Sequence, residues 1–259
     1  MEKKFFFFDV DNTLTIWPQG TMPEDTLYAL DGLREAGHRL ALATGRLQAD
    51  SLRFGRTAGI ADIVADGGYS VTIDNELIYM KPLERSACLA YIDQLEEAGI
   101  RWAVITENEI ERITPYDEVA GKVRPWDVMR TVHDAAFDYR EVRDFYKIFT
   151  YFATPEQQAF PLRFFGLKGM YFGTEAVLIE PMKKSVGVKY MADHYGVRYE
   201  DVVVFGDGVN DLSLFDSAWM NIAMGNAKDV LKEKADYVTA DCDKGGILQA
   251  VRRFGWIRE

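Results

Sequence analysis

Two short apolar runs, each followed at once by aspartates, restrict the fold of this chain more than any other feature. Residues 5–8 are four phenylalanines, and residues 202–205 read Val-Val-Val-Phe. Both runs are too short for a helix and lack the alternation of a half-exposed strand, so they predict strands buried on both faces of a parallel sheet. The aspartates are Asp9 and Asp11 after the first run, and Asp207 and Asp211 after the second.

The position of these aspartates predicts a binding site. Open α/β sheets bind their ligands at the carboxyl ends of the parallel strands, where all four side chains are expected. Four carboxylates that converge on one crevice repel one another unless a cation lies between them. Mg²⁺ prefers such oxygen ligands, so the pattern indicates a metal-assisted site for an anionic substrate.

The rest of the chain follows the same organisation, with one interruption. Strand–helix alternation in the first 78 residues, and again from about residue 179, indicates a doubly wound parallel α/β core. Residues 79–178 read as a smaller α+β domain inserted into that core, and residues 121–138 are its least readable part. We therefore expect a core domain of residues 1–78 and 179–259 and an inserted domain of residues 79–178.

The individual elements are expected from hydrophobic periodicity and from stop signals such as Gly37 and Gly196. Thr154-Pro155 indicates a helix start in the insert, with the threonine as cap. Beyond the two runs above, the pattern predicts core strands at 39–43, 60–65, 221–224 and 237–239, and core helices from 23, 47, 184, 210 and 228 and at the C-terminus. In the insert, it predicts helices at 84–98 and from 154, and strands at 101–106, 110–114, 147–152, 170–173 and 176–179.

Composition narrows the range of partners and compartments. The net charge of −11 and the isoelectric point near 4.9 disfavour nucleic acid and anionic membranes, so a small-molecule substrate is expected. Cys88 and Cys242 lie far apart without metal-ligand spacing, which indicates two thiols in a reducing compartment rather than a disulfide. The apolar run at residues 5–8 is too short for a signal peptide or a membrane span, and we expect a cytoplasmic protein.

Four motifs in a fixed order carry a family resemblance. They are Asp9-Val10-Asp11-Asn12-Thr13-Leu14, then Ala43-Thr44-Gly45-Arg46, then Lys184 with a helix that ends at Gly196-Val197, and finally Gly206-Asp207-Gly208-Val209-Asn210-Asp211. In this order, and with residues 223–227 and 235–239 downstream, the chain resembles the haloacid dehalogenase superfamily and, within it, the Cof-type phosphatases. The resemblance covers residues 3–78 and 178–255.

The resemblance implies an Mg²⁺-dependent phosphatase that forms an aspartyl-phosphate intermediate. Asp9 is then the nucleophile, and Asp11 protonates the leaving alkoxide and afterwards activates water. The alternative is that both carboxylates cap a turn. Thr44 and Gly45 are expected to bind the phosphoryl group, while Lys184 supplies a fixed positive charge.

The resemblance also implies a set of metal ligands. Asp9, Asp207 and the backbone carbonyl of Asp11 are expected to bind Mg²⁺, and Asp211 is expected to hold a water on the metal. Asn210 is expected to orient the phosphoryl group. The alternative for Asp211 is an acid in the first turn of a helix, where it would favour the helix dipole.

Several other residues have two interpretations. Thr44 is either part of a phosphate cradle or a plain helix cap, and Lys183 competes with Lys184, although the distance to Gly196 favours Lys184. Arg46 either contacts a substrate phosphate or pairs with a surface acid, and Asn226 is either a substrate contact or a turn residue. In the insert, the candidates to stack on or pair with a substrate are Trp102, Arg112, Trp126 and Arg130, with cap core or solvated surface as the alternative.

Two residues depart from the family pattern outside the catalytic set. Asn12 stands where glycine is more common, and Asp66 stands where asparagine is frequent. The three histidines, His38, His133 and His194, are scattered along the chain, so a histidine metal centre is not indicated.

The location of the insert separates the candidate functions. The stretch between Thr44 and Lys184 is far longer than a crossover needs, so the insert lies between the second and third motifs. This resembles the α/β-capped subgroup, most of whose members are phosphatases of sugar phosphates and related metabolites, while Asp11 argues against dehalogenase chemistry. A phosphatase is the leading interpretation, with a sugar phosphomutase of the phosphomannomutase type and a catalytically silent metabolite-binding protein as alternatives.

Overall fold

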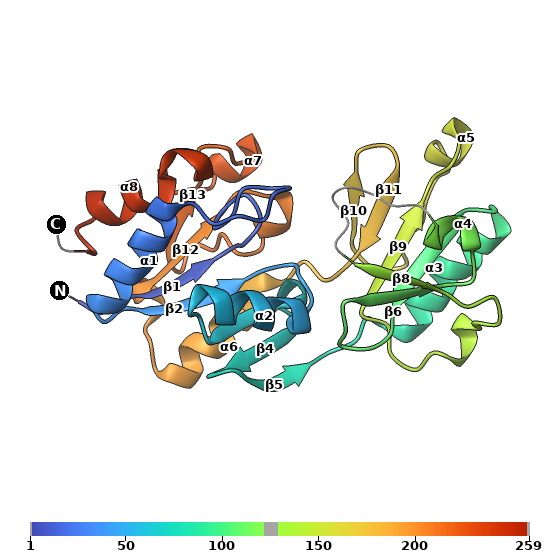
Figure 1. Cartoon of the computed structure of the whole chain (residues 1–259), viewed down its shortest axis with the longest axis horizontal. Coiled ribbons are helices and arrows are strands. Elements are labelled where there is room, and N and C mark those ends of the chain that lie inside the picture. Colours follow the sequence, from blue (N-terminus) through green and yellow to red (C-terminus); the bar gives the residue numbers. More distant parts are fainter. Residues whose placement is uncertain (1, 122–128, 258–259) are drawn as a thin grey trace. The chain divides into compact units, whose positions relative to one another are not determined.

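The computed structural model describes residues 2–121 and 129–257 and divides the chain into two compact units (Figure 1). The core unit consists of Met1–Met80 and Met182–Glu259, and the inserted unit consists of Lys81–Pro181. The boundaries expected from the sequence lie slightly earlier in the chain, after residues 78 and 178. Each unit contains its own sheet and its own buried apolar cluster.

The core unit is built on one sheet with eight strands among the described residues. Six neighbouring strands are parallel, and β4 and β5 extend the sheet as an antiparallel hairpin. The chain order reverses at β1, between β2 and β12, and open α/β sheets bind ligands at such a reversal. In sheet order, the strands are β14 (Tyr237–Val238), β13 (Met220–Ala223), β12 (Val202–Gly206), β1 (Phe5–Phe8), β2 (Arg39–Ala43), β3 (Asp62–Ala65), β4 (Ser70–Ile73) and β5 (Glu76–Met80).

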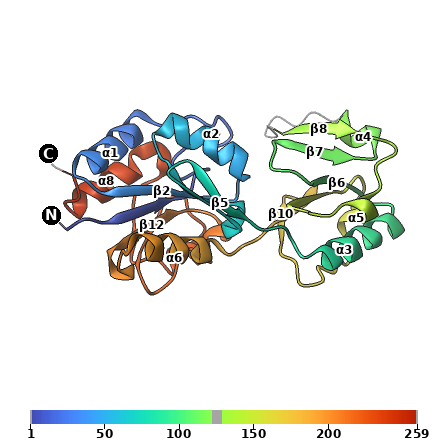
Figure 2. The same cartoon turned by 90° about the horizontal axis from the view of Figure 1, so that it is seen from below.

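The four phenylalanines of β1 make this strand the centre of two apolar layers. Because side chains alternate along a strand, Phe5 and Phe7 join one cluster while Phe6 and Phe8 join the other. All four are fully buried, and burial of each stabilises the fold by about 1.5–3 kcal/mol. The layers are completed by α1 (Glu24–Glu35), α2 (Gln48–Ala58) and α8 (Gly246–Arg253) on the face of Phe6, and by α6 (Lys184–Tyr195) and α7 (Asp229–Lys232) on the face of Phe5 (Figure 2). The predicted doubly wound α/β core is confirmed.

The inserted unit has the α+β architecture that the sequence predicts. Every neighbouring pair in its six described strands is antiparallel except β7 with β8. Cys88, Ile92 and Leu95 of α3 share one apolar cluster with Trp102 of β6. The strands, in sheet order, are β10 (Gly169–Phe172), β11 (Ala176–Ile179), β9 (Lys147–Tyr151), β6 (Arg101–Ile105), β7 (Glu111–Thr114) and β8 (Arg130–His133), and the helices are α3 (Arg85–Glu97), α4 (Asp117–Ala120) and α5 (Pro155–Gln158).

Two local predictions are wrong. The β4–β5 hairpin was not expected, although its turn residues Asp74 and Asn75 both have positive φ, which asparagine and aspartate tolerate in hairpin turns. The helix expected from Asn210 is only the 3-10 turn η4 (Val209–Asp211). The carboxylate of Asp211 accepts hydrogen bonds from the N–H groups of residues 207 and 208, which fixes a tight turn at this point.

The described helices are all short. The longest of them, α3, has 13 residues, and within the described ranges no helix is long and apolar enough to cross a membrane. The other 3-10 turns are η1 (Asp66–Gly68), η2 (Tyr139–Glu141), η3 (Tyr199–Asp201) and η5 (Cys242–Lys244).

Candidate active site

Asp9 lies where the pairing of β1 with β12 ends. Phe8 is opposite Phe205 in this parallel pair, and the Asp9 N–H donates to the carbonyl oxygen of Phe205 at 3.0 Å. The residues that follow the two strands therefore meet at the same edge of the sheet. Asp9 is only 4% exposed, so its carboxylate is held inside the protein at the reversal point of the sheet.

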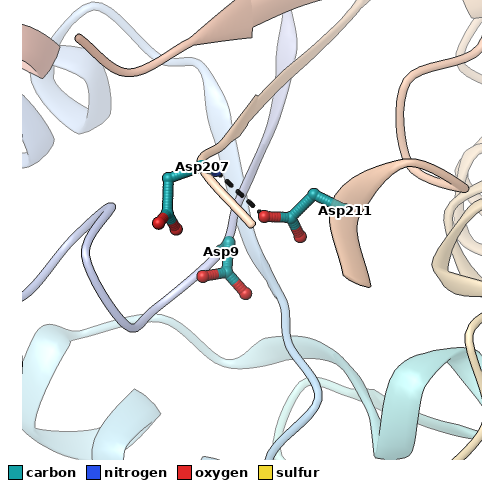
Figure 3. Close-up of side chains that lie close together, drawn as sticks. All are labelled: Asp9, Asp207 and Asp211. Carbon is teal, nitrogen blue, oxygen red and sulfur yellow. Dashed lines mark hydrogen bonds between the residues drawn. The ribbon is translucent and has the colours of Figure 1, made fainter. Parts of the chain in front are cut away.

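Three carboxylates converge at this edge. One oxygen from each of Asp9, Asp207 and Asp211 lies within 4.8 Å of the others, and Figure 3 shows the three side chains close together. The fully buried ammonium of Lys184, at the first residue of α6, donates to Asp9 Oδ1 at 2.6 Å and to Asp211 Oδ1 at 2.5 Å. Lys183 is exposed, so the choice between the two lysines falls on Lys184.

The single positive charge of Lys184 does not neutralise the three carboxylates, so the pKa values of groups in the cluster are shifted. Burial, followed by repulsion from Asp211, raises the pKa of Asp9 well above its ordinary value, against the opposing effect of Lys184. Burial and then Asp211 raise the pKa of Asp207 to about 7. Burial alone would lower the pKa of Lys184, but the carboxylates of Asp211 and Asp9 outweigh it and raise the pKa. The site thus favours additional positive charge.

The donor set fits a hard divalent cation such as Mg²⁺. Such ions prefer carboxylate and carbonyl oxygens, which Asp9 and Asp207 provide on neighbouring strands. The carboxylate of Asp207 accepts a hydrogen bond from the hydroxyl of Thr13 at 3.3 Å, while Lys184 contacts the other two members of the cluster. Asp207 therefore carries the excess negative charge that a cation would compensate.

Asp211 also organises the loop after β12. Its Oδ2 accepts hydrogen bonds from the N–H groups of Asp207 and Gly208, at 3.0 and 2.9 Å, while its Oδ1 contacts Lys184. Asp211 is the last residue of η4. It stabilises the loop through these hydrogen bonds and also contributes negative charge to the site. The side chain of Asn210 packs against Gly208, where a Cβ atom would lie 2.3 Å from Asn210 Oδ1.

Arg46 pairs with two partly exposed acids, Asp11 and Asp50, so this structure shows the second of its two interpretations, an ion pair. Its Nε donates to Asp11 Oδ2 at 2.9 Å and its Nη2 donates to Oδ1 at 2.6 Å, while Nη1 lies 3.4 Å from Asp50 Oδ2. Burial alone would lower the pKa of Arg46, but the hydrogen bonds and charge of Asp11 raise it. In this structure the arginine thus contacts both the expected general acid and a neighbouring acid on α2.

The interpretation of Thr44 as a helix cap is wrong, although the helix itself begins close to the expected position, with Leu47 as its N-cap. Helix α2 begins at Gln48, and the carboxylate of Asp66 accepts the Gln48 N–H at 3.1 Å. Thr44 is buried at the end of β2, where its Oγ1 accepts a hydrogen bond from the Arg46 N–H at 3.1 Å. Gly45 lies between these two residues on the same connecting segment. Asp66, which departs from the family pattern, thus caps the helix that Thr44 was expected to cap.

Asn226 joins three loops through backbone contacts. Its Nδ2 donates to the Asn12 carbonyl oxygen at 2.9 Å, and its Oδ1 accepts from the Cys242 N–H at 2.8 Å. These contacts go beyond those of a plain turn residue.

The candidate residues of the inserted unit have different environments. Trp102 is fully buried in the apolar cluster, which makes it a core residue. Arg112 is 2% exposed and lies 4.8 Å from the ring centroid of Phe149, while its Nε donates to the hydroxyl of Thr131. The exposed Arg130 pairs with Glu111 at 3.2 Å, and Trp126 lies outside the described residues.

Sequence reasoning missed two hydroxyl groups that support the site. Thr13 contacts Asp207, and Ser213 accepts the backbone N–H of Lys184 at 3.0 Å. Thr13 lies inside the first motif, so its position was a usable signal. Ser213 lies outside the motifs, and its contact depends on how the loop after η4 folds back.

Comparisons with known proteins agree with this geometry. The profile of the haloacid dehalogenase-like hydrolases matches residues 6–251. YkrA of Bacillus subtilis, provisionally named a phosphatase, is 29% identical over the whole of both chains. A Streptococcus pyogenes protein, provisionally named a bifunctional phosphatase and peptidyl-prolyl cis-trans isomerase, is 29% identical over 98% of this chain, which spans 54% of that longer protein. The solved structure of the HAD subclass IIB sugar phosphatase BT4131 has a TM-score of 0.80 and 26% identity, covering 98% of this chain and 100% of that one.

An α/β core with an inserted α+β unit, and a buried lysine among aspartates at the sheet reversal, define a phosphoryl-transfer hydrolase. The chain belongs to the haloacid dehalogenase-like hydrolases. Within that family it is a phosphatase of the Cof type, as its motifs predict.

Proposed function

We propose that this phosphatase hydrolyses a small phosphorylated metabolite, with a sugar phosphate as the favoured class, and that it uses Mg²⁺ and an aspartyl-phosphate on Asp9. The observation that carries the proposal is the cluster of Asp9, Asp207 and Asp211 around the buried Lys184. A phosphate monoester is an anion, and this arrangement combines a nucleophilic carboxylate with the positive charge that an anion requires. Support for the sugar class comes from BT4131, which is named a sugar phosphatase.

The first step transfers the phosphoryl group to Asp9. Lys184 engages Asp9 Oδ1, so Oδ2 is the oxygen that we expect to attack phosphorus. The bond from phosphorus to the leaving oxygen breaks, and Asp11 donates its proton to that oxygen, which departs as an alcohol. Arg46 must release one oxygen of Asp11 for this transfer, since both oxygens accept from the guanidinium in this structure.

The second step returns the enzyme to its starting state. Asp11, now ionised, takes a proton from a water molecule, and the resulting hydroxide attacks the phosphorus of the aspartyl-phosphate. The phosphorus–oxygen bond to Asp9 breaks, and inorganic phosphate leaves. Lys184 stabilises the charge that returns to Asp9 in this step.

In this proposal the phosphoryl group is held by residues that follow β2 and β12 and by Lys184 at the start of α6. Thr44 follows β2 and uses its hydroxyl oxygen to accept the Arg46 N–H, so the hydroxyl hydrogen can donate to a phosphoryl oxygen. We place the Gly45 backbone and the Asn210 side chain in the same role. Lys184 adds the fixed charge.

The cation completes this site. Asp9, Asp207 and the backbone carbonyl of Asp11 would hold Mg²⁺, with Asp211 beside them in the cluster. When bound, Mg²⁺ reduces the repulsion between the carboxylate and the phosphate and polarises the phosphoryl oxygens. In our proposal the inserted unit acts as the cap that selects the substrate. The buried thiols Cys88 and Cys242, which form no disulfide, support a reducing, cytoplasmic compartment.

Phosphate release from a panel of sugar, nucleotide, flavin and pyridoxal phosphates tests the proposal, with Mg²⁺ and with a chelator. We expect chelator-sensitive release from a few substrates and no turnover by Asp9→Asn. Product isomers that appear only with a sugar bisphosphate would instead indicate a mutase. Near-normal activity of Asp9→Asn would remove Asp9 from the nucleophilic role.

A further inference from the structure

The loop after β1 is fixed at its base and partly exposed at its tip. The carbonyl oxygen of Val10 accepts hydrogen bonds from the N–H groups of Leu14 and Thr15, at 3.0 and 2.9 Å, which closes the base. Asp11 and Asn12 form the tip, and Asn12 has a left-handed backbone with φ of 62°. The position of the proposed general acid therefore depends on what holds this tip.

Asn226, in the loop after another strand, holds this tip through a hydrogen bond. Its Nδ2 donates to the carbonyl oxygen of Asn12 at 2.9 Å, directly after Asp11 in the chain. Its Oδ1 accepts the N–H of Cys242 at 2.8 Å, so the side chain is fixed from both ends. These two backbone partners also define which end of the amide is oxygen, because a carbonyl only accepts and an N–H only donates.

The hydrogen bond between Asn226 and Asn12 connects the loops on either side of the loop that carries Asp207 of the acidic cluster. Asn226 follows β13, and β12 lies between β13 and β1 in the sheet. The Asn226–Asn12 bond therefore spans the loop that carries Asp207. Asp207 is tied to the same neighbours, since its carbonyl oxygen accepts the Lys228 N–H at 2.9 Å and its carboxylate contacts Thr13. The loops after β1, β12 and β13 thus form one connected ring.

We infer that Asn226 is a positioning residue that holds the backbone of Asp11 in place for proton transfer to the leaving group. Asn226 was a candidate for substrate binding, but both ends of its amide are engaged by the backbone. The inference rests on the proposed role of Asp11 as the general acid. Loss of the Asn226 bond lets the tip move, and a small displacement of a general acid strongly lowers its efficiency.

The experiment compares two aryl phosphates of similar shape with Mg²⁺ present. 4-Nitrophenyl phosphate needs little protonation of its leaving group, whereas phenyl phosphate needs more. We expect Asn226→Ala to lower kcat/KM, which reports the steps up to loss of the leaving group, by about tenfold or more on phenyl phosphate and by less than about twofold on 4-nitrophenyl phosphate. Asn226→Asp keeps the acceptor for the Cys242 N–H, but replaces the donor to Asn12 with a second oxygen and adds a negative charge, so it should displace the tip at least as much and give the same pattern. It also carries the test if Asn226→Ala does not fold.

Gln157 supplies a chemically matched control in the inserted unit. Its amide also donates to one backbone carbonyl, that of Gly99, at 3.0 Å and accepts one N–H, that of Ala153, at 2.7 Å. Gln157→Ala should leave the ratio of the two kcat/KM values unchanged, even if its thermal stability falls as much as that of Asn226→Ala.

Asp11→Asn separates the two possible failures. If it lowers both activities equally, the proposed role of Asp11 is wrong and the inference falls with it. If it selectively lowers phenyl phosphate turnover but the Asn226 variants do not, the proposed function stands and the positioning role of Asn226 is rejected.

Discussion

The guanidinium of Arg46 donates to both carboxylate oxygens of Asp11, from Nε at 2.9 Å and from Nη2 at 2.6 Å. The two residues come from loops after neighbouring strands, since Asp11 follows β1 and Arg46 follows β2. The ring of Phe54 lies 5.4 Å from the guanidinium carbon and supports it. A planar, two-pronged contact of this kind sets the orientation of the carboxylate, which a lysine cannot reproduce.

We therefore predict that Arg46→Lys impairs catalysis although it conserves the charge. The variant should lower kcat on phenyl phosphate by about tenfold, because Asp11 loses its fixed orientation. Stability should change by less than about 1 kcal/mol, because the pair is partly exposed and such pairs contribute little. Steady-state kinetics and thermal unfolding measure the two effects.

Arg198 provides the matched control for this substitution. Its Nε and a terminal nitrogen also contact one carboxylate, that of Asp201, although both reach the same oxygen, Oδ2, and the arginine itself is exposed. Arg198→Lys should leave kcat unchanged. Wild-type kcat in Arg46→Lys would mean that the fork does not orient Asp11 during turnover.

Lys184 and Lys183 provide a second comparison between adjacent residues. Lys184 is fully buried between Asp9 and Asp211, whereas Lys183 is exposed. Removal of one partner from a buried ion pair leaves uncompensated charge and costs about 3–5 kcal/mol. We expect Lys184→Met to lose activity and to unfold more easily by about this amount at neutral pH with chelator present.

Mg²⁺ distinguishes an electrostatic cause from a packing defect in Lys184→Met. Added Mg²⁺ should raise the melting temperature of the variant more than that of the wild type, because the three carboxylates lack their ammonium. Lys183→Met should resemble the wild type in activity, stability and response to Mg²⁺. Equal behaviour of the two variants would contradict the assignment of Lys184.

Much of the fold can be predicted from local sequence patterns, because successive buried residues along a strand appear in the sequence as an apolar run. The run of residues 5–8 requires burial on both faces, and the two apolar layers on either side of β1 satisfy it. The β4–β5 hairpin was missed because Asp74-Asn75 was not recognised as a turn with two positive φ values. An aspartate followed by an asparagine is a known signal for a hairpin turn, and the sequence contains it.

The candidate site could be predicted only in part. Aspartates at strand ends meet by topology, so the positions of Asp9 and Asp207 follow from the strand order alone. The partner of Arg46 depends on how a long side chain crosses between two loops, and local pattern holds no information on that path. The contact of Asn226 with Asn12 likewise joins two loops that are 214 residues apart in the chain.

The raised pKa of Asp207, about 7, predicts how stability depends on pH without metal. The folded state binds a proton that the unfolded state releases near the ordinary value of 3.8, so the contribution of Asp207 to stability is fully present below about pH 3.8 and is lost as pH rises through 7. At about 1.4 kcal/mol per unit of pKa shift, this effect is on the order of 4 kcal/mol. Thermal unfolding from about pH 4 to 8 with chelator measures it.

Mg²⁺ should reverse this trend because it competes with the proton on Asp207. The rise in melting temperature caused by Mg²⁺ should therefore grow as pH increases through 7. In Asp207→Asn, both the decline without metal and the growth with metal should be much smaller. A Mg²⁺ effect that is independent of pH in the wild type would exclude Asp207 as a ligand.

At Gly68, the loop after β3 packs closely against the backbone that precedes Lys184. Its φ is 102°, and a Cβ atom here would lie 2.2 Å from the carbonyl oxygen of Lys183. Gly68→Ala must therefore displace the segment that positions Lys184. We expect destabilisation of at least about 2 kcal/mol and a kcat at least about tenfold lower.

Gly166 separates this close contact from backbone strain alone. Its φ of 90° is similar, but a Cβ atom there has no neighbour within 4 Å. Gly166→Ala thus adds the strain of a positive φ without the collision, and it should lose stability while retaining kcat. If Gly68→Ala also retains kcat, the segment before Lys184 can move without disturbing the contact between its ammonium and Asp9. The lysine would then be positioned by the carboxylates themselves rather than by the backbone of α6.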